Sequence, residues 1–385
     1  MQPLVPAYGA GSLADVTPSL LAALGVPGAV DVLGFAPTPK VCLLLVDGLG
    51  WRLLADHAAD APFLSSLAVA DRAITCGFPA TTATSLASLG TGTPAGEHGF
   101  VGFSFAAGDE LLNALRWHRH GVAEHVDLRS TLIPEEVQPH PTVWQRAEAA
   151  GVAVRLVAPQ LHQRSGLTRA VLRGGGFLGT VALGDLVSRA IGAMREPGRV
   201  FCYAYHADLD AVGHFYGPGS APWRRQLRFV DLLAASLAED MPADSTLVIT
   251  ADHGMVAVGD ADKADFDADE RLSEDVRLLG GEARVRHVYT RAGATGDVLA
   301  RWSAVLGDRA WITTRDEAIA NGWFGPHVSD RVRERVGDLV VAAKDSLVVV
   351  SSRREPHVSD FLGQHGSLTA EEQLVPLLIK GCVTV

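Results

Sequence analysis

The sequence predicts an α/β protein with a mostly parallel central sheet, helices on both faces of that sheet, and a smaller α+β cap insertion. Two observations predict this class. The clearest strand candidates are continuous apolar runs, which are typical of strands covered on both faces. Longer Ala- and Leu-rich stretches lie between them, as the crossover helices of parallel sheets do. We expect strands at residues 41–46, 152–157, 200–205 and 246–250, and helices at 61–70, 142–150, 184–194 and 224–237.

The composition is that of an ordinary globular protein, with 48% hydrophobic and 20% charged residues in a chain of 385. The net charge of -11 argues against binding of a nucleic-acid duplex, which requires a basic face. An acidic protein can still bind a small phosphate ester if bound metal ions supply local positive charge. We therefore expect a small-molecule partner, while oligomeric state is not encoded in any pattern found here.

The compartment expected from the sequence is the cytoplasm. The first residues show no basic stretch followed by a continuous apolar one, so no signal peptide is predicted. The longest apolar runs are far shorter than a membrane span, so no membrane association is expected. The cysteines form no CxxC pair and are interpreted as small buried hydrophobic residues in a reducing compartment. They are Cys42, Cys76, Cys202 and Cys382.

A change in amino-acid composition after residue 255 predicts two regions. Residues 256–340 are interpreted as an inserted cap, because an acid-rich polar stretch is followed by short strand-like pieces. The core is expected to comprise residues 1–255 plus 341–385. Further expectations are cap strands near 284–289 and 310–314, and a return to the core at 338–341 and 347–350.

One glycine-rich segment matches a nucleotide-binding fingerprint without its context. Residues 174–179 fit GxGxxG, but no convincing strand precedes them and no βαβ unit surrounds them. We therefore predict a flexible loop there, and no dinucleotide site.

Acidic residues follow three of the predicted strands. The first strand runs into Asp47, the third into a segment that contains Asp210, and the fourth into Asp252. A single aspartate in such a place often caps the next helix. Ligands of open α/β sheets bind beyond the carboxyl ends of the strands, however, so the three together predict one site.

Histidines accompany these aspartates at spacings that suit metal ligands. His214 follows Asp210 by four residues, and His253 follows Asp252 directly. His365 lies in a glycine-flanked turn near the end of the chain. Mixed Asp and His ligation favours zinc, with manganese or iron as alternatives.

A run of small residues after Pro79 predicts a helix that begins with threonines. Thr81, Thr82 and Thr84 crowd its N-terminus, where free backbone N–H groups and the helix dipole attract an anion. One threonine is explained by capping. The others suggest a site for a phosphate group and a hydroxyl nucleophile.

Five segments in this order resemble the alkaline phosphatase superfamily, and specifically its nucleotide pyrophosphatase/phosphodiesterase (type I phosphodiesterase) branch. The likeness extends over roughly residues 40–370. The segments are Asp47-Gly48, the Thr82 run that closes with Gly92 to Gly99, Asp210-x-x-Gly213-His214, Asp252-His253-Gly254-Met255 and His365-Gly366.

The resemblance implies a two-metal site with two ligand sets. Asp210, His214 and His365 would hold one zinc ion. The other would be held by Asp47, Asp252 and His253, with Thr82 on the same ion as the nucleophile. Thr82 is chosen by counting back from the Thr91-Gly92 landmark, and Thr81 stays open as a one-residue alternative. The implied mechanism passes through a phospho-threonine intermediate, with overall retention at phosphorus.

The implied reaction is hydrolysis of phosphodiester or pyrophosphate bonds in nucleotide-like substrates. No Arg or Lys lies between Ala73 and Leu115, which favours diesters over the more highly charged monoesters. The asparagine that related enzymes use to contact the phosphoryl group is replaced by Gly102-Phe103, and Asn113 is the candidate substitute. Two alternatives remain: a phosphomonoester or phosphonate hydrolase on the same two-metal site, and a catalytically silent, metal-bound scaffold.

Overall fold

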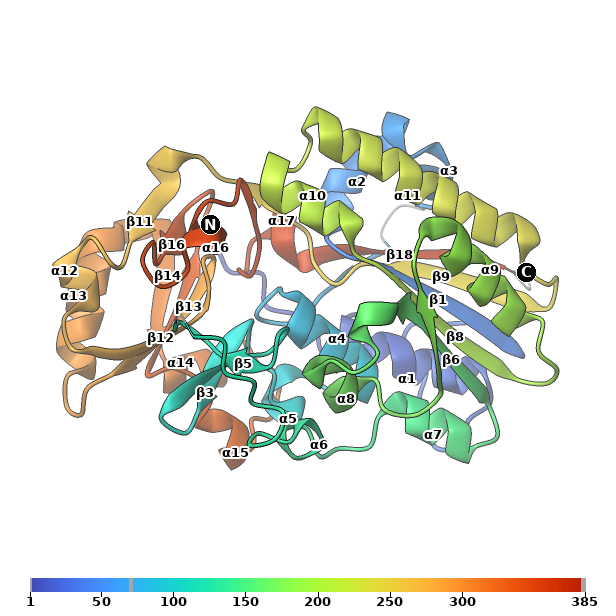
Figure 1. Ribbon diagram of the computed structural model, residues 1–385, viewed down its shortest axis with the longest axis horizontal. Coiled ribbons are helices and arrows are strands. Elements are labelled where there is room, and N and C mark those ends of the chain that lie inside the picture. Colours follow the sequence, from blue (N-terminus) through green and yellow to red (C-terminus); the bar gives the residue numbers. More distant parts are fainter. Residues whose placement is uncertain (1, 69–71, 123, 382–385) are drawn as a thin grey trace.

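The computed structural model describes residues 2–68, 72–122 and 124–381, and it is built around one large sheet (Figure 1). Seven strands form this sheet in the order β2-β18-β9-β1-β8-β6-β7. The strands from β9 to β7 are parallel, whereas β18 pairs antiparallel with both β9 and β2. Their bounds are β2 (Ala73–Thr75), β18 (Leu374–Lys380), β9 (Ser245–Thr250), β1 (Lys40–Val46), β8 (Val200–His206), β6 (Ala153–Pro159) and β7 (Gly176–Thr180).

Helices cover both faces of this sheet, as predicted. The face that is uppermost in Figure 1 carries α2 (Trp51–Asp56), α3 (Pro62–Leu67), α9 (Leu183–Met194), α10 (Asp208–Tyr216) and α11 (Ala221–Asp240). The lower face carries α1 (Leu13–Ala23), α4 (Thr82–Thr91), α7 (Val143–Ala149) and α8 (Gly166–Val171). Because both faces are covered, residues 41–46 of β1 are completely buried, which explains their continuous apolar run.

The four predicted strands of the core are confirmed as β1, β6, β8 and β9. The four predicted helices are confirmed as α3, α7, α9 and α11, although α3 is shorter than expected. The end of that predicted helix, residues 69 and 70, lies outside the described residues.

Residues 174–179 are not the flexible loop that we predicted. Gly176–Thr180 form the edge strand β7, which pairs in parallel with β6. Glycine lowers strand propensity, but pairing with a formed neighbour overrides this local preference. A dinucleotide fingerprint requires a strand before the glycines, whereas here the glycine-rich segment is itself the strand.

A second, four-stranded sheet lies beside the first and forms the cap (Figure 1). It is antiparallel, in the order β12-β13-β15-β14, and it includes the two predicted cap strands as β13 and β14. The cap elements are α12 (Glu270–Ser273), β12 (Val276–Glu282), β13 (Val285–Thr290), α13 (Thr295–Leu306), β14 (Ala310–Thr314), α14 (Arg315–Ala320), α15 (Asp330–Arg333) and β15 (Leu339–Ala343).

The expected return to the core at residues 338–341 and 347–350 is wrong. β15 pairs with β13 and β14 of the cap sheet, and β16 (Val348–Val350) pairs with β11 (Lys263–Asp265). Both segments are short apolar runs, and such runs do not reveal which sheet they join. The division of the chain into core and cap stays a prediction, but β15 belongs with the cap strands.

Smaller elements complete the structure. A three-stranded sheet consists of β3 (Ser104–Ala107), β4 (Glu110–Asn113) and β5 (His118–Arg119), and the Ser104 hydroxyl donates to the Gly281 carbonyl of β12 at 3.0 Å. The other elements are α5 (Ala95–His98), α6 (Pro134–Val137), β10 (Val256–Ala257), α16 (Pro356–Ser359), β17 (Gly363–Gln364) and α17 (Ala370–Gln373), with 3-10 turns at Ala58–Asp60, Gln160–His162, Asp260–Asp262 and Gly307–Arg309.

Three of the cysteines are buried and unpaired, as predicted: Cys42, Cys76 and Cys202. Cys382 lies outside the described residues. Among the helices that the structure describes, none has the length and apolar character needed to cross a membrane.

Candidate active site

The predicted site residues meet at the carboxyl ends of three neighbouring strands. Asp47 directly follows β1, Asp210 lies in the first turn of α10 after β8, and Asp252 follows β9. The chain turns sharply after Asp47, where Gly48 has a φ of +74°. A Cβ atom at Gly48 would lie 3.0 Å from the Cα of Asp210, so glycine allows the two aspartate-bearing segments to approach closely.

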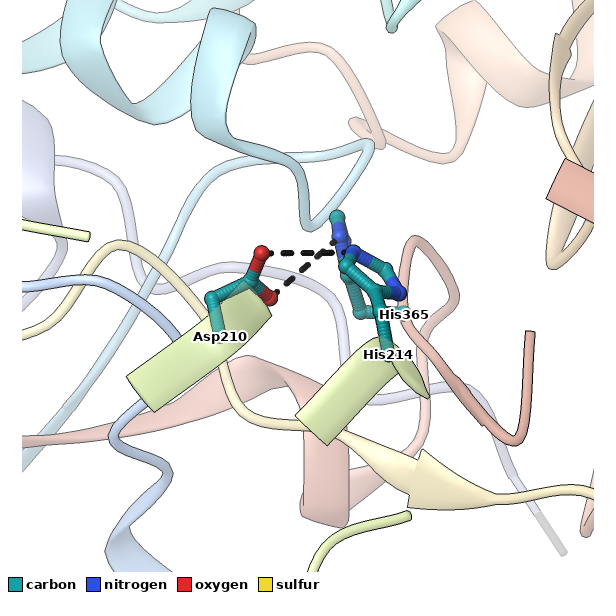
Figure 2. Close-up of side chains that lie close together, drawn as sticks. All are labelled: Asp210, His214 and His365. Carbon is teal, nitrogen blue, oxygen red and sulfur yellow. Dashed lines mark ion pairs between the residues drawn. The ribbon is translucent and has the colours of Figure 1, made fainter. Parts of the chain in front are cut away.

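Asp210, His214 and His365 form the first group of potential metal ligands (Figure 2). The spacing of four residues places Asp210 and His214 on one face of α10, with 3.2 Å between Asp210 Oδ2 and His214 Nε2. His365 approaches from the turn after β17, and its Nε2 is 3.9 Å from Asp210 Oδ1. The three potential ligand atoms lie within 4.8 Å of one another.

A second group consists of Asp47, Asp210 and His253, with Asp252 beside it. His253 Nε2 is 3.5 Å from Asp47 Oδ1 and 3.4 Å from Asp252 Oδ2. The rings of His253 and His365 stack at 3.5 Å, which joins the two groups into one cluster. Asp210 therefore lies within reach of both groups, whereas the sequence placed it in the first alone.

All three histidines are oriented by their Nδ1 atoms. His214 donates to the Gly363 carbonyl at 2.7 Å, His365 to Ala80 at 2.8 Å and His253 to Gly254 at 3.0 Å. A neutral imidazole that donates through Nδ1 has a lone pair on Nε2. Each Nε2 lone pair then faces carboxylate oxygens, an arrangement that favours a cation between them.

The carboxylates of the cluster are buried without enough hydrogen-bond partners. Among the described residues, Asp47 Oδ1, Asp210 Oδ1 and Asp252 Oδ2 accept no hydrogen bond. Burial raises the pKa of Asp47 well above its usual range, and the charges of Asp252 and Asp210 raise it further. Crowded, unpaired acceptors of this kind are costly unless cations neutralise them, so the residues present fit a metal centre.

The histidines of the first group respond to burial and to Asp210. Burial and then the neighbouring His253 hold the pKa of His365 well below its usual range. Burial also acts against protonation of His214, but the charge of Asp210 outweighs it and raises the pKa of His214. Asp210 shows the reciprocal effect: burial opposes ionisation, yet His214 holds the pKa of this carboxyl far below its usual range.

Thr82 is the threonine that faces this cluster. It is the first residue of α4, and its Oγ1 lies 3.3 Å from His253 Nε2. Thr81 is the N-cap residue of the helix, with extended backbone angles. Ser85, one turn further on, donates to the Asp252 carbonyl at 2.6 Å and so holds the loop of Asp252 and His253 against the helix.

Tyr205 contributes to the site but was not predicted from the sequence. It lies near the end of β8, and its hydroxyl donates to Asp47 Oδ2, so that Oδ1 of Asp47 is left to face His253. The available signal was a tyrosine at the end of an apolar strand, because a buried phenol usually needs a polar partner. Tyr205 thus orients one of the predicted ligands.

A buried ion pair supports the turn that carries His365. Arg284, between β12 and β13, makes two hydrogen bonds to Glu372, at 3.0 and 2.7 Å. Glu372 also accepts from the Ser367 backbone at 2.9 Å and from the Thr369 hydroxyl at 2.6 Å. The position of His365 therefore depends on contacts between cap and core that no local sequence motif predicts.

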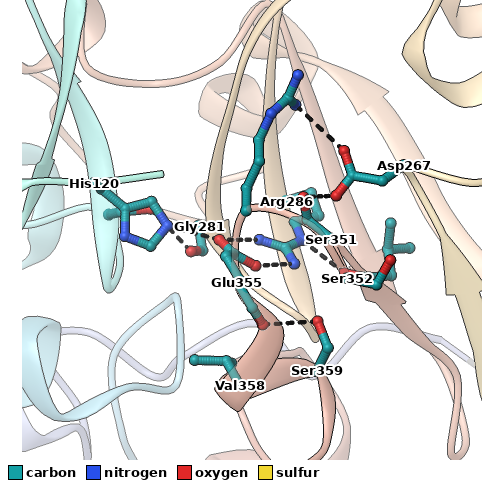
Figure 3. Close-up of polar contacts among 12 residues, drawn as sticks. His120, Asp267, Gly281, Arg286, Ser351, Ser352, Glu355, Val358 and Ser359 are labelled. Carbon is teal, nitrogen blue, oxygen red and sulfur yellow. Dashed lines mark hydrogen bonds and ion pairs between the residues drawn. The ribbon is translucent and has the colours of Figure 1, made fainter. Parts of the chain in front are cut away.

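Asn113 does not contact the cluster among the described residues. Its Oδ1 accepts from the Arg116 backbone at 3.0 Å, and its Nδ2 lies 3.4 Å from His120 Nδ1. His120 in turn donates to Glu355 at 2.6 Å, and Glu355 pairs with Arg286 at 2.6 Å (Figure 3). Asn113 is thus part of a buried polar network, and its role in substrate binding stays a prediction.

A mostly parallel sheet with an Asp/His cluster at its carboxyl edge, beside a threonine that begins a helix, defines the alkaline phosphatase-like class of α/β proteins. The sequence profile described as type I phosphodiesterase / nucleotide pyrophosphatase matches residues 41–368. The chain belongs to this family, whose members are hydrolases of the phosphodiester or phosphonate type. No curated protein matches the chain in sequence.

Solved structures confirm the fold. Murine ectonucleotide pyrophosphatase/phosphodiesterase 5, as an inactive threonine-to-alanine variant in complex with AMP, has 19% identity and a TM-score of 0.68, with 89% of this chain and 88% of that chain covered. The human counterpart has 18% identity and a TM-score of 0.66, with the same coverage. Phosphonoacetate hydrolase from Sinorhizobium meliloti, in complex with phosphonoacetate, has 21% identity and a TM-score of 0.65, with 91% and 92% covered.

Proposed function

We propose that the protein hydrolyses phosphodiester or pyrophosphate bonds of small, nucleotide-like substrates through a phospho-threonine at Thr82. The observation that carries this proposal is the convergence of unpaired carboxylate oxygens and Nε2 lone pairs beside the Thr82 hydroxyl. The proposed ligands of two zinc ions, with manganese or iron as alternatives, are Asp47, Thr82, Asp210, His214, Asp252, His253 and His365.

Cations bound there supply positive charge that lowers the pKa of the Thr82 hydroxyl and offsets the charge of the phosphate group. In the first step Thr82 Oγ1 gives up its proton to solvent and attacks phosphorus. The bond to the leaving oxygen breaks, and that oxygen takes up a proton. In the second step water attacks phosphorus, the bond to Oγ1 breaks, and Thr82 regains a proton. Free N–H groups at the start of α4 face the non-bridging oxygens.

Three findings outside the cluster support this assignment. The AMP complex of the murine relative was obtained with an inactive threonine-to-alanine variant, which fits a threonine nucleophile. No Arg or Lys lies between Ala73 and Leu115, around the nucleophile. Two arginines, Arg52 and Arg116, could still fold over the site to neutralise a monoester, and Arg52 lies instead 3.6 Å from Glu371. Both charge observations favour singly charged diesters.

Phosphonate hydrolysis on the same residues is the second candidate. Phosphonoacetate hydrolase covers this chain at least as fully as the ectonucleotide enzymes do, and at 21% identity. A catalytically silent scaffold is the remote alternative, and it is opposed by the presence of a complete ligand set next to Thr82.

The test compares hydrolysis of four compounds by chelator-treated protein and by protein reloaded with zinc, manganese or iron. The compounds are bis-p-nitrophenyl phosphate, p-nitrophenyl phosphate, a dinucleoside pyrophosphate and phosphonoacetate. We expect metal-dependent hydrolysis that is faster for the diester than for the monoester. Faster cleavage of phosphonoacetate would transfer the assignment to the second candidate. Inactivity with every metal would contradict enzymatic function.

A further inference from the structure

Glu282, the last residue of β12, brings a carboxyl group from the cap to the nucleophile segment. This residue is only 6% exposed. A Cβ atom at Gly366, next to His365, would lie 2.8 Å from Glu282 Cγ and 3.1 Å from its Oε1. A Cβ atom at Gly102 would lie 3.8 Å from the same oxygen. Glycines on two different segments thus give this carboxyl access to the site.

The two oxygens of Glu282 have different surroundings. Oε2 accepts a hydrogen bond from the Phe103 backbone at 2.8 Å, which fixes the carboxyl group in place. Oε1 is buried and accepts no hydrogen bond from any described residue. The Thr81 hydroxyl, adjacent to the proposed nucleophile, lies near enough to influence the carboxyl. A fixed side chain with one unpaired oxygen beside the nucleophile points to a ligand.

Among the described residues, no Lys, Arg or His side chain forms an ion pair with Glu282. Arg286, the second residue of β13, is engaged by Glu355 at 3.1 and 2.6 Å (Figure 3). It also donates to the Val349 carbonyl at 2.7 Å. Burial raises the pKa of Glu282 to about 8, against the opposing effects of the Phe103 N–H, Arg286 and Thr81, while Glu355 adds to the increase. At neutral pH the side chain therefore carries a proton and can donate a hydrogen bond.

We propose that Glu282 contacts the substrate, with its protonated Oε1 donating a hydrogen bond to a non-bridging oxygen of the phosphate group held at Thr82. This inference rests on the proposed function, because it places a phosphate group at Thr82. A neutral donor suits a singly charged diester, in a region that lacks Arg and Lys between Ala73 and Leu115. Ionisation of Glu282 would replace the donor by a charge that repels the phosphate group.

Three variants test this inference in zinc-loaded protein. Glu282→Ala removes the carboxyl, and Glu282→Gln keeps a neutral donor at every pH. As a control, Glu110→Gln removes one charge from the half-buried start of β4, where Glu110 pairs with Arg119. For each variant, binding of inorganic phosphate is measured by calorimetry at pH 6.5 and 9.5. The value of kcat/KM for bis-p-nitrophenyl phosphate and the melting temperature are measured alongside.

We expect Glu282→Ala to weaken phosphate binding and to lower kcat/KM by about tenfold to a hundredfold. Glu282→Gln should stay within about threefold of wild type at pH 6.5 and bind phosphate more tightly than wild type at pH 9.5. A purely structural role would lower the melting temperature without this pH-dependent difference between Gln and wild type.

Two results would separate the inference from the function on which it rests. Wild-type hydrolysis together with unchanged phosphate binding by Glu282→Ala would overturn only the role of Glu282. Phosphate binding that changes identically with pH in wild type and Glu282→Gln would also overturn only the role of Glu282. Absence of hydrolysis and of phosphate binding by the zinc-loaded wild type would overturn the proposed function and the inference together.

Discussion

At the scale of single residues, Thr82 is the position at which the proposed chemistry is concentrated. Replacing it by alanine removes the attacking oxygen but leaves Asp47, Asp252 and His253 in place, so metal binding should persist. We expect a loss of at least about a thousandfold in kcat. Thr82→Ser keeps a hydroxyl and should retain measurable activity. Steady-state rates together with metal content check this, and equal activity of Thr82→Ala and wild type would rule out a phospho-threonine.

Glu282 also predicts a dependence of stability on pH. Its folded-state pKa is raised from 4.5 to about 8, so the folded state keeps a proton that the unfolded chain loses. The stability associated with this group is fully present below pH 4.5 and is lost as pH rises through 8. Relative to Glu282→Gln, wild type should thus lose roughly 2–4 kcal/mol of unfolding free energy between pH 5 and pH 9. Denaturant titrations of both proteins at the two pH values check this, and a constant difference would refute it.

At the scale of elements, the packing of α4 against α8 depends on Gly90. A Cβ atom there would lie 2.1 Å from the Val171 carbonyl oxygen, so Gly90→Ala should destabilise the protein by about 1–3 kcal/mol despite alanine's better helix propensity. Gly192, in α9, is the matched control because a Cβ atom there meets nothing within 4 Å. Gly192→Ala should be neutral or stabilise by up to about 1 kcal/mol. Thermal unfolding of both variants tests this prediction, and equal shifts in melting temperature would contradict it.

The strands of the core sheet could be predicted because strands buried on both faces are continuous runs of apolar residues, as in β1. The sheet to which β15 belongs could not be predicted. Leu339–Ala343 is an apolar run like those of the core strands, and only its pairing with β13 and β14 assigns it to the cap. The cluster of Asp47, Asp252 and their neighbours was predictable because parallel strands end at one edge. The position of Glu282 near this cluster was not predictable. Glu282 lies on a cap strand that is distant in sequence from the cluster, and no sequence motif surrounds it.

At the scale of the whole molecule, the proposed metal ions connect segments from five distant parts of the chain. Asp47, His253 and His365 follow different strands. Among the described residues, one carboxylate oxygen each of Asp47, Asp210 and Asp252 is buried there without a hydrogen-bond partner, which favours a cation. Metal should therefore stabilise the folded state, by about 2.7 kcal/mol when free zinc is a hundredfold above its dissociation constant. Melting curves with and without a chelator check this. The same melting temperature in both would show that the cluster is stable without a cation.

Whether this cluster holds two metal ions can be measured by elemental analysis of the purified, zinc-exposed protein after removal of free metal. We expect two zinc ions per chain, and fewer when His365 or Asp210 is replaced by alanine. A protein that retains no zinc, manganese or iron after exposure to each would contradict this expectation.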